Sequence, residues 1–252
     1  MKPLFLIQAR TGSNRFPNKV FEKLFNDFTL IDIVLTRLQM AAGVTKDDLV
    51  VLTTTNPLDD GLAKYLEKQR INTFRGNEQN VYKRFKDYLT SLSQYPEYFF
   101  RVCSDNPFIE PEFIEQMIKV ADSESEFDYL SFHDYKKTPA ILTHYGFFVE
   151  LIKTDSFLSA ESLLTNTTQK EHVTPIFHST NYFMNKYLEM PNLLHRDDIR
   201  LTFDTKEDLD VIKDIFLELN TIDFSYRDIL GVIENNDKLL SSMITSIRKN
   251  LK

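Results

Sequence analysis

The sequence has one cysteine, no tryptophan and no long apolar run, and two of these shortages exclude a class of structure. Because Cys103 is the single cysteine, neither an internal disulfide nor a cysteine-cluster metal site can form. No apolar run approaches the roughly 20 residues that cross a bilayer, and residues 4–7 are too short for the core of a signal peptide. We therefore expect a cytoplasmic protein without membrane insertion.

The charge balance is acidic, with 30 lysine and arginine residues against 37 aspartate and glutamate residues, a formal net charge of −7. Nucleic-acid binding rests on many basic contacts to phosphates, so this balance argues against a nucleic-acid partner but allows a local cationic pocket. A chain of 252 residues can bury a sizeable core, and we expect one α/β domain. The 21 phenylalanines and 11 tyrosines should carry much of that core.

Strand-like apolar runs alternate with helical spacing along most of the chain. This order predicts right-handed crossovers and a mainly parallel sheet with helices on both faces, a three-layer α/β fold. The periodicity is lost over residues 133–144. Strands are predicted at residues 4–9, 48–53, 72–74, 98–102, 127–132, 146–152 and 199–203. Helices are predicted at residues 30–41, 79–92, 111–121, 155–165 and 239–252, and a further helix begins at residue 57. Capping boxes at 205–208 and 225–228 predict the starts of two more helices.

The first strand is followed by a loop that carries three cations and no acidic residue. Arg10, Arg15 and Lys19 need an anion to face, and Gly12 and Pro17 allow a tight turn that converges them. A phosphate chain would fit. The Gly-Lys-Ser/Thr ending of a Walker loop is missing, and Gly-x-Gly-x-x-Gly occurs nowhere, which argues against common ATPase and dinucleotide sites. The alternative is a solvated turn with surface cations.

Two aspartates stand directly after predicted strands. Asp105 follows the strand at 98–102, and Asp204 follows the strand at 199–203. Ligands of open α/β sheets bind beyond the carboxyl ends of the strands, so both carboxylates can meet beside the cationic loop. Magnesium takes one or two carboxylates and leaves its other positions to water and phosphates. The sequence therefore predicts a magnesium site, against the alternative of a turn residue and a residue before a helix cap.

Further candidates lie elsewhere along the chain. Arg75 and Gly76 end a strand and could present backbone amides to a base or phosphate, or form a plain turn. Glu150, His172 and Thr174 lie in the less regular half and are candidates for substrate contacts. The sequence locates no Ser or Cys partner for nucleophilic catalysis by the histidine.

With these residues in place, the chain resembles the cytidylyltransferase family that activates acidic sugars as CMP derivatives, especially its spore coat polysaccharide biosynthesis protein F branch. The segment 7–20, Ile-Gln-Ala-Arg-Thr-Gly-Ser-Asn-Arg-Phe-Pro-Asn-Lys-Val, is similar to the family's N-terminal signature. Later blocks follow in the same order. They cover residues 74–85, 101–111, 171–175 (Glu-His-Val-Thr-Pro) and 200–209 (Arg-Leu-Thr-Phe-Asp-Thr-Lys-Glu-Asp-Leu).

The resemblance implies a Rossmann-like nucleotidyltransferase of the glycosyltransferase-A type that uses CTP and Mg²⁺ on a sugar or sugar acid. It divides one domain into a nucleotide-binding half (1–130), a sugar-recognition and dimerisation region (131–195) and a segment with the second metal aspartate and the last helices (196–252). It also allows a homodimer. The nucleotide loop carries onto Arg10, Gly12, Ser13, Arg15 and Lys19, and the metal aspartates carry onto Asp105 and Asp204.

The sequence departs from the family's pattern at three positions. Asn18 and Ser104 stand where the family usually has glycine, and Lys206 stands where it usually has proline. Asparagine tolerates the left-handed conformation, so the loop should survive, whereas a side chain at Ser104 would crowd a phosphate. Two alternatives stay open: a glycosyltransferase that uses a nucleotide sugar, which would normally have Asp-x-Asp where 104–106 reads Ser-Asp-Asn, and a degenerate nucleotide-binding protein.

Overall fold

The computed structural model describes residues 2–13, 15–124 and 126–249. The predicted helix at 239–252 is therefore seen only to residue 249. The strands are β1 (Phe5–Gln8), β2 (Lys23–Phe25), β3 (Phe28–Thr29), β4 (Leu49–Thr54), β5 (Asn72–Gly76), β6 (Tyr98–Cys103), β7 (Tyr129–His133), β8 (Glu150–Lys153) and β9 (Asn185–Glu189). The helices are α1 (Leu30–Gln39), α2 (Asp60–Lys68), α3 (Val81–Ser91), α4 (Pro111–Ser123), α5 (Thr154–Ser159), α6 (Thr167–His172), α7 (Pro175–His178), α8 (Lys206–Leu219), α9 (Tyr226–Glu234) and α10 (Asp237–Lys249).

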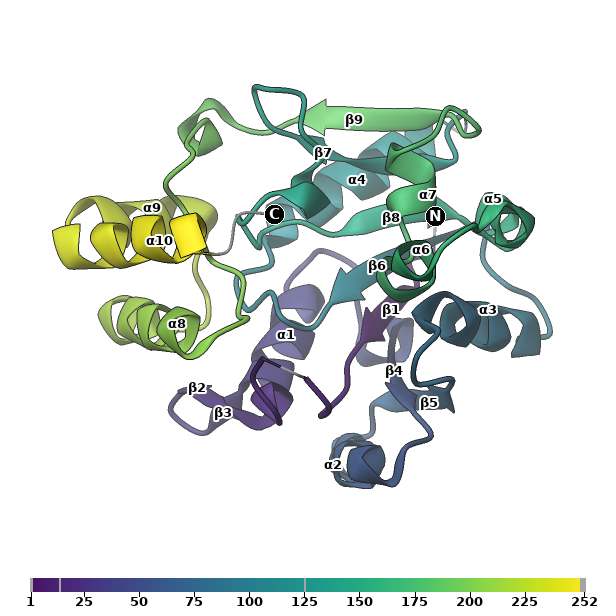
Figure 1. Cartoon of the computed structure of the whole chain (residues 1–252), viewed down its shortest axis with the longest axis horizontal. Coiled ribbons are helices and arrows are strands. Elements are labelled where there is room, and N and C mark those ends of the chain that lie inside the picture. The colour runs from purple at the N-terminus through teal and green to yellow at the C-terminus, as the bar shows by residue number, and fades with distance from the viewer. Residues whose placement is uncertain (1, 14, 125, 250–252) are drawn as a thin grey trace.

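The central sheet has the strand order β5-β4-β1-β6-β8-β7-β9 (Figure 1). Strands β5, β4, β1 and β6 are parallel, and β8 runs antiparallel to both β6 and β7. The continuous apolar runs that form β1, β4 and β6 are buried on both faces, as parallel strands require. The expected mainly parallel α/β fold is confirmed.

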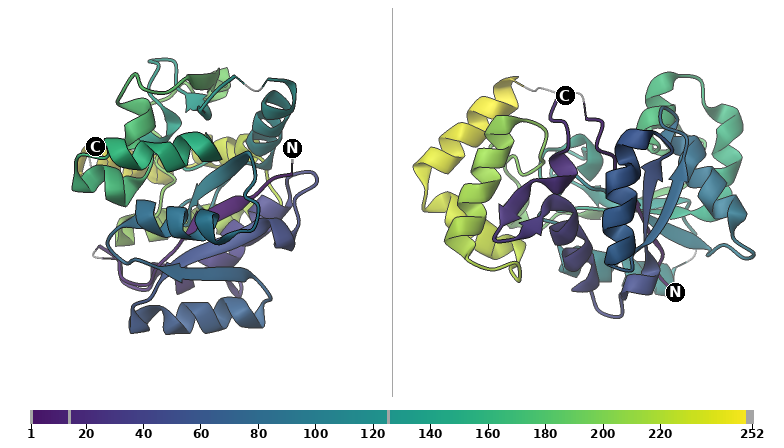
Figure 2. Two further views of the ribbon diagram at one scale, coloured as in Figure 1. Left: turned by 90° about the vertical axis from the view of Figure 1, so that its right-hand side faces the viewer. Right: turned by 90° about the horizontal axis from the view of Figure 1, so that it is seen from below.

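Helices cover both faces of this sheet (Figure 2). On one face, Phe5 and Ile7 of β1 join a cluster with the apolar sides of α1, α4, α8 and α9. On the other face, Leu6 joins a cluster with α3, α5 and α7. Side chains alternate between the faces of a strand, so this division follows from the sequence of β1 itself. Among the described residues, no helix is both long enough and apolar enough to cross a membrane.

The capping boxes predicted for α8 and α9 are both present. The Thr205 side chain accepts a hydrogen bond from the Asp208 amide, and the Ser225 side chain accepts one from the Asp228 amide. In each box the aspartate carboxylate accepts a hydrogen bond from the amide of the capping residue. The strand predicted at 199–203 is wrong. This segment makes isolated backbone hydrogen bonds, such as Leu201 N to His144 O and Phe203 N to Asp105 O, but it pairs with no strand and belongs to no sheet.

The structure also holds elements that the sequence pattern did not predict, at residues 23–29 and in the less regular half. The β2–β3 hairpin, the edge strand β9 and the short helices α6 and α7 are too short to show a period. The strand predicted at 146–152 begins only at Glu150, because the preceding residues pass close to the 199–203 segment. There Gly146 has φ +69°, and a Cβ would come 3.0 Å from the Leu201 carbonyl oxygen.

We expect Gly146→Ala to lower the free energy of unfolding by about 1–3 kcal/mol, because it forces an alanine into the left-handed conformation and brings its Cβ against the backbone. The matched control is Gly231→Ala in α9, where a Cβ meets nothing within 4 Å. That change should be neutral or stabilise by up to about 1 kcal/mol. Urea unfolding of both variants checks the pair, and equal effects would contradict the assignment.

Candidate functional site

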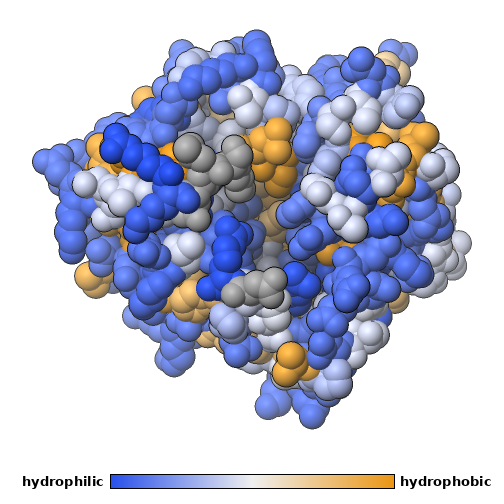
Figure 3. All heavy atoms as spheres, viewed as in Figure 1, coloured by the Kyte–Doolittle hydropathy of each residue, from blue (hydrophilic) through white to orange (hydrophobic). Residues whose placement is uncertain are grey.

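A cleft of about 710 Å³ opens at the carboxyl ends of β1 and β6. The face in Figure 3 is hollowed near its centre, with a mainly hydrophilic rim. Gln8 pairs with Cys103 in the parallel register, so the loops that follow the two strands start side by side. This register brings Arg10, Arg15 and Lys19 of the cationic loop into one cleft with Ser104 and Asp105.

The ammonium of Lys19 lies between the two predicted aspartates. Its Nζ is 3.4 Å from Asp105 Oδ2 and 3.7 Å from Asp204 Oδ1, and it donates to the Phe203 carbonyl at 2.8 Å. Arg15 Nη2 contacts Asp204 Oδ1 at 2.7 Å. Two carboxylates and two cations from distant parts of the sequence therefore meet at one end of the cleft.

Asp204 is held from behind by a buried network that the sequence reasoning missed. Arg200 Nη2 donates to Asp204 Oδ2 at 3.2 Å, and Arg200 also binds Asp208 through Nε at 2.7 Å. Burial opposes ionisation of Asp208, but the hydrogen bonds and charge of Arg200 outweigh it and lower the pKa of Asp208. Asp208, which completes the capping box of α8, thus also fixes the arginine that orients Asp204. The capping box located Asp208, but its spacing gave no sign of this second contact.

The cationic loop is fixed by Asp59, which was also missed. Asp59 Oδ1 accepts hydrogen bonds from the Thr11 amide and the Thr11 hydroxyl, both at 2.7 Å, and Oδ2 accepts from Thr54. Burial would raise the pKa of this carboxyl, yet these hydrogen bonds lower it. Thr11 O in turn accepts from the amides of Ser13 and Asn18. Asn18 has φ 59°, the left-handed conformation that asparagine tolerates.

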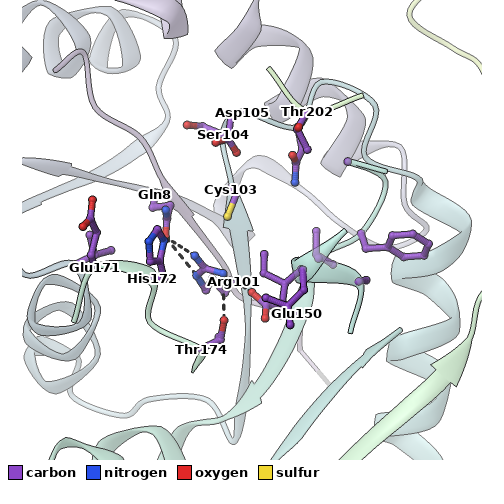
Figure 4. A pocket seen from close by; sticks show the side chains of 18 of the residues that line it. Gln8, Arg101, Cys103, Ser104, Asp105, Glu150, Glu171, His172, Thr174 and Thr202 are labelled. Carbon is purple, nitrogen blue, oxygen red and sulfur yellow. Dashed lines mark hydrogen bonds and ion pairs between the residues drawn. The ribbon is translucent and has the colours of Figure 1, made fainter. Parts of the chain in front are cut away.

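The floor of the cleft is a closed polar network around Arg101 (Figure 4). Arg101 pairs with Glu150, and it donates to Gln8 Oε1 at 3.0 Å and to Thr174 Oγ1 at 3.4 Å. Tyr129 donates to the other Glu150 oxygen at 2.5 Å. Burial alone would lower the pKa of Arg101, but the negative charge around it, including that of Glu150, raises it. Glu150 therefore lines the cleft as half of a buried ion pair.

One wall of the cleft comes from residues 171–175. Arg10 Nη2 lies 3.8 Å from Glu171 Oε1. His172 and Thr174 line the cleft on either side of Val173, which has φ 69° and ψ −57°. The Thr174 amide closes this tight turn on the His172 carbonyl at 2.8 Å. A β-branched residue at positive φ is strained, and its burial in the core holds it there.

Three predicted residues are not brought to the cleft wall. Arg75 turns away from the cleft to Asp60, at 2.7 Å, and to the Thr54 carbonyl, at 2.8 Å. Gly76 packs against Arg84, and Gly12 shapes the loop without lining the cleft. Ser13 does line it, together with Ser104.

The donor set at Lys19 suits a small hard cation. Asp105 and Asp204 already converge on one positive charge, and magnesium takes one or two carboxylates with water and phosphates in its remaining positions. No cluster of three or more His, Cys, Asp or Glu side chains arranged for metal binding occurs among residues 2–13, 15–124 and 126–249. The protein's own contribution here is thus two carboxylates.

Sequence comparison decides the family. The family model described as cytidylyltransferase matches residues 4–236. The chain belongs to the cytidylyltransferase family. A relative, the spore coat polysaccharide biosynthesis protein SpsF of Bacillus subtilis, is 30% identical over 251 residues, which cover 98% of this chain and 94% of SpsF. The resemblance in the sequence motifs is thereby confirmed.

Solved cytidylyltransferase structures share the fold. A cytidylyltransferase from Leptospira borgpetersenii superposes with a TM-score of 0.81 at 27% identity, over 95% of this chain and 97% of that one. CMP:2-keto-3-deoxy-manno-octonic acid synthetase, solved with CTP, gives a TM-score of 0.64 at 12% identity, over 87% of this chain and all of the other. The fold is that of the nucleotide-diphospho-sugar transferases, as the resemblance implied.

The Asp59 network predicts a pH-dependent stability difference. Asp59→Asn should lower the free energy of unfolding by about 1–3 kcal/mol near neutral pH, because it removes hydrogen bonds to a buried charge. The folded pKa is lowered, so this stabilisation is present above the unfolded pKa of about 3.9 and disappears as the pH falls through the folded pKa. Urea unfolding across acid pH should therefore show the difference from the native chain shrinking.

The control is Asp60→Asn, since Asp60 is half exposed and makes a surface ion pair. It should cost no more than about 1 kcal/mol. A destabilisation of Asp59→Asn that stays constant as the pH falls would contradict the role of its charge.

Proposed function

We propose that this member of the cytidylyltransferase family transfers CMP from CTP to a hydroxyl or acid oxygen of a sugar or sugar acid, with release of pyrophosphate. The acceptor oxygen attacks the α-phosphorus in line, the bond from the α-phosphorus to the bridging oxygen breaks, and that oxygen leaves with pyrophosphate. A hydroxyl acceptor releases its proton to solvent in this step. The observation that carries the proposal is the convergence of Lys19, Asp105 and Asp204 in the cleft of a chain of this family.

The chain's residues have separate tasks in this reaction. Lys19, Arg15 and Arg10 come from one loop and line the cleft, where their charges would stabilise the phosphates. Asp105 and Asp204 would hold Mg²⁺, which supplies charge neutralisation of the phosphates when bound. Positioning and electrostatic stabilisation provide most of the catalysis in phosphoryl transfer, so no protein nucleophile is needed.

The acceptor lies over the floor of the cleft in this proposal. Thr174 and His172 line that part of the cleft, and the Arg101–Glu150 pair keeps the floor rigid. The proposal keeps the sequence-based division, with CTP bound mainly by residues before 131 and the sugar bound by residues 131–195, where a homodimer would also form. By analogy with the name of the Bacillus relative, the product would serve surface polysaccharide synthesis.

The test is pyrophosphate release from CTP with Mg²⁺ and a panel of sugars and sugar acids. Asp105→Asn should lower turnover about a hundredfold or more, because it removes half of the carboxylate pair, while thermal unfolding stays close to that of the native chain. Asp27→Asn is the matched control, since the Asp27 side chain is 96% exposed and does not line the cleft. The turnover of this variant should be unchanged.

The outcomes separate the alternatives. Tight CTP binding without turnover would indicate a nucleotide-binding protein, in keeping with the Ser104 side chain in the cleft. Preference for a nucleotide sugar over CTP would indicate a glycosyltransferase. A native chain that neither binds nor consumes CTP in the presence of Mg²⁺ would rule out the proposed function.

A further inference from the structure

A buried cation that no carboxylate pairs with lines the cleft. Arg84 of α3 is 2% exposed and belongs to the cleft wall. Its Nη1 donates to the Asn77 carbonyl at 3.2 Å, and its buried Nε has no hydrogen-bond partner. Among the described residues, no carboxylate lies within ion-pair distance of this guanidinium.

The other cations of the cleft all have acidic partners. The pairs are Arg10 with Glu171, Arg15 with Asp204, Lys19 with Asp105 and Arg101 with Glu150. Arg84 therefore stands apart from them. Asp59 and Glu78 attract its charge only from a longer range.

Burying an ion without a counter-charge costs several kcal/mol. Burial and the nearby charge of Arg10 lower the pKa of Arg84 to about 10, so the guanidinium is still charged at neutral pH. Arg10 pairs with Glu171 at 3.8 Å, whereas the two carboxylates that attract Arg84, Asp59 and Glu78, lie beyond ion-pair distance. An anion in the cleft would offset the cost.

The structure makes room for this arginine. At Gly76 a Cβ would lie 3.0 Å from Cγ of Arg84 and 3.2 Å from the Phe74 ring, so the aliphatic part of Arg84 packs where a larger residue would not fit. The side chain of Arg75, a predicted nucleotide-binding residue, points to Asp60 instead. Of the two arginines, Arg84 of α3 lines the cleft and Arg75 of β5 does not.

We propose that Arg84, with Arg10 beside it, binds an oxyanion of the ligand. The oxyanion is a phosphate of the nucleotide or the carboxylate of an acidic acceptor, and both offer the paired oxygens that a guanidinium fork recognises. Naming a nucleotide phosphate or an acceptor carboxylate as the source of the oxyanion rests on the proposed function. The binding of an oxyanion rests on the geometry of Arg84 alone.

The test uses calorimetric titration of the full chain with two probes, inorganic pyrophosphate and pyruvate. Arg84→Gln should weaken the binding of at least one probe about tenfold or more, the size expected for a hydrogen bond to a charged group. Arg84→Lys keeps the charge and loses the fork, so its affinity should be intermediate. Lys83→Gln is the matched control, because it removes a neighbouring charge that pairs with Asp87 on the exposed side of α3, and it should bind as the native chain does.

Each outcome decides something. A loss with pyrophosphate assigns the phosphate, and a loss with pyruvate alone assigns the carboxylate. Unchanged binding of both probes by Arg84→Gln, even with a lowered melting temperature, would reduce Arg84 to a structural tie to Asn77 and overturn the inference. So would a native chain that binds neither probe. Failure of the pyrophosphate-release assay with these binding differences intact would overturn only the proposed function.

Discussion

The ammonium of Lys19 is the contact on which the arrangement of the cleft depends. It reaches Asp105, Asp204 and the Phe203 carbonyl, and so joins three segments that are far apart in the sequence. Two carboxylates about 5 Å apart repel each other by roughly 3 kcal/mol at an effective dielectric constant of ~20. A cation between them removes this repulsion, which explains why these carboxylates can approach one cleft from different elements.

Buried carboxylates outside the cleft hold this arrangement in place. Asp208 caps α8 and binds Arg200, which in turn orients Asp204. Asp59 receives three hydrogen bonds and fixes the start of the cationic loop through Thr11. In both cases a helix terminus or a turn supplies a rigid hydrogen-bond acceptor. This acceptor fixes the positions of the residues that face the ligand.

The floor of the cleft and the wall at Arg84 differ in how their charges are balanced. At the floor, Arg101 and Glu150 neutralise each other and Tyr129 completes the pair, so this part is rigid and its charge is internal. In α3, Arg84 lacks such a partner among the residues that the structure describes. The first arrangement suits a surface that holds a neutral part of a ligand, and the second suits a surface that receives an anion.

The sequence by itself determined the features that depend on neighbouring residues: the buried strands β1, β4 and β6 and the capping boxes of α8 and α9. The alternation of strands and helices gave the α/β class, and the family motifs added the nucleotidyltransferase fold and the left-handed conformation at residue 18. Only the tertiary structure decided which side chains meet, because a side chain's direction depends on packing against distant elements. It turned Arg75 away from the cleft, brought Arg84 in from a helix, and left the 199–203 segment outside the sheet.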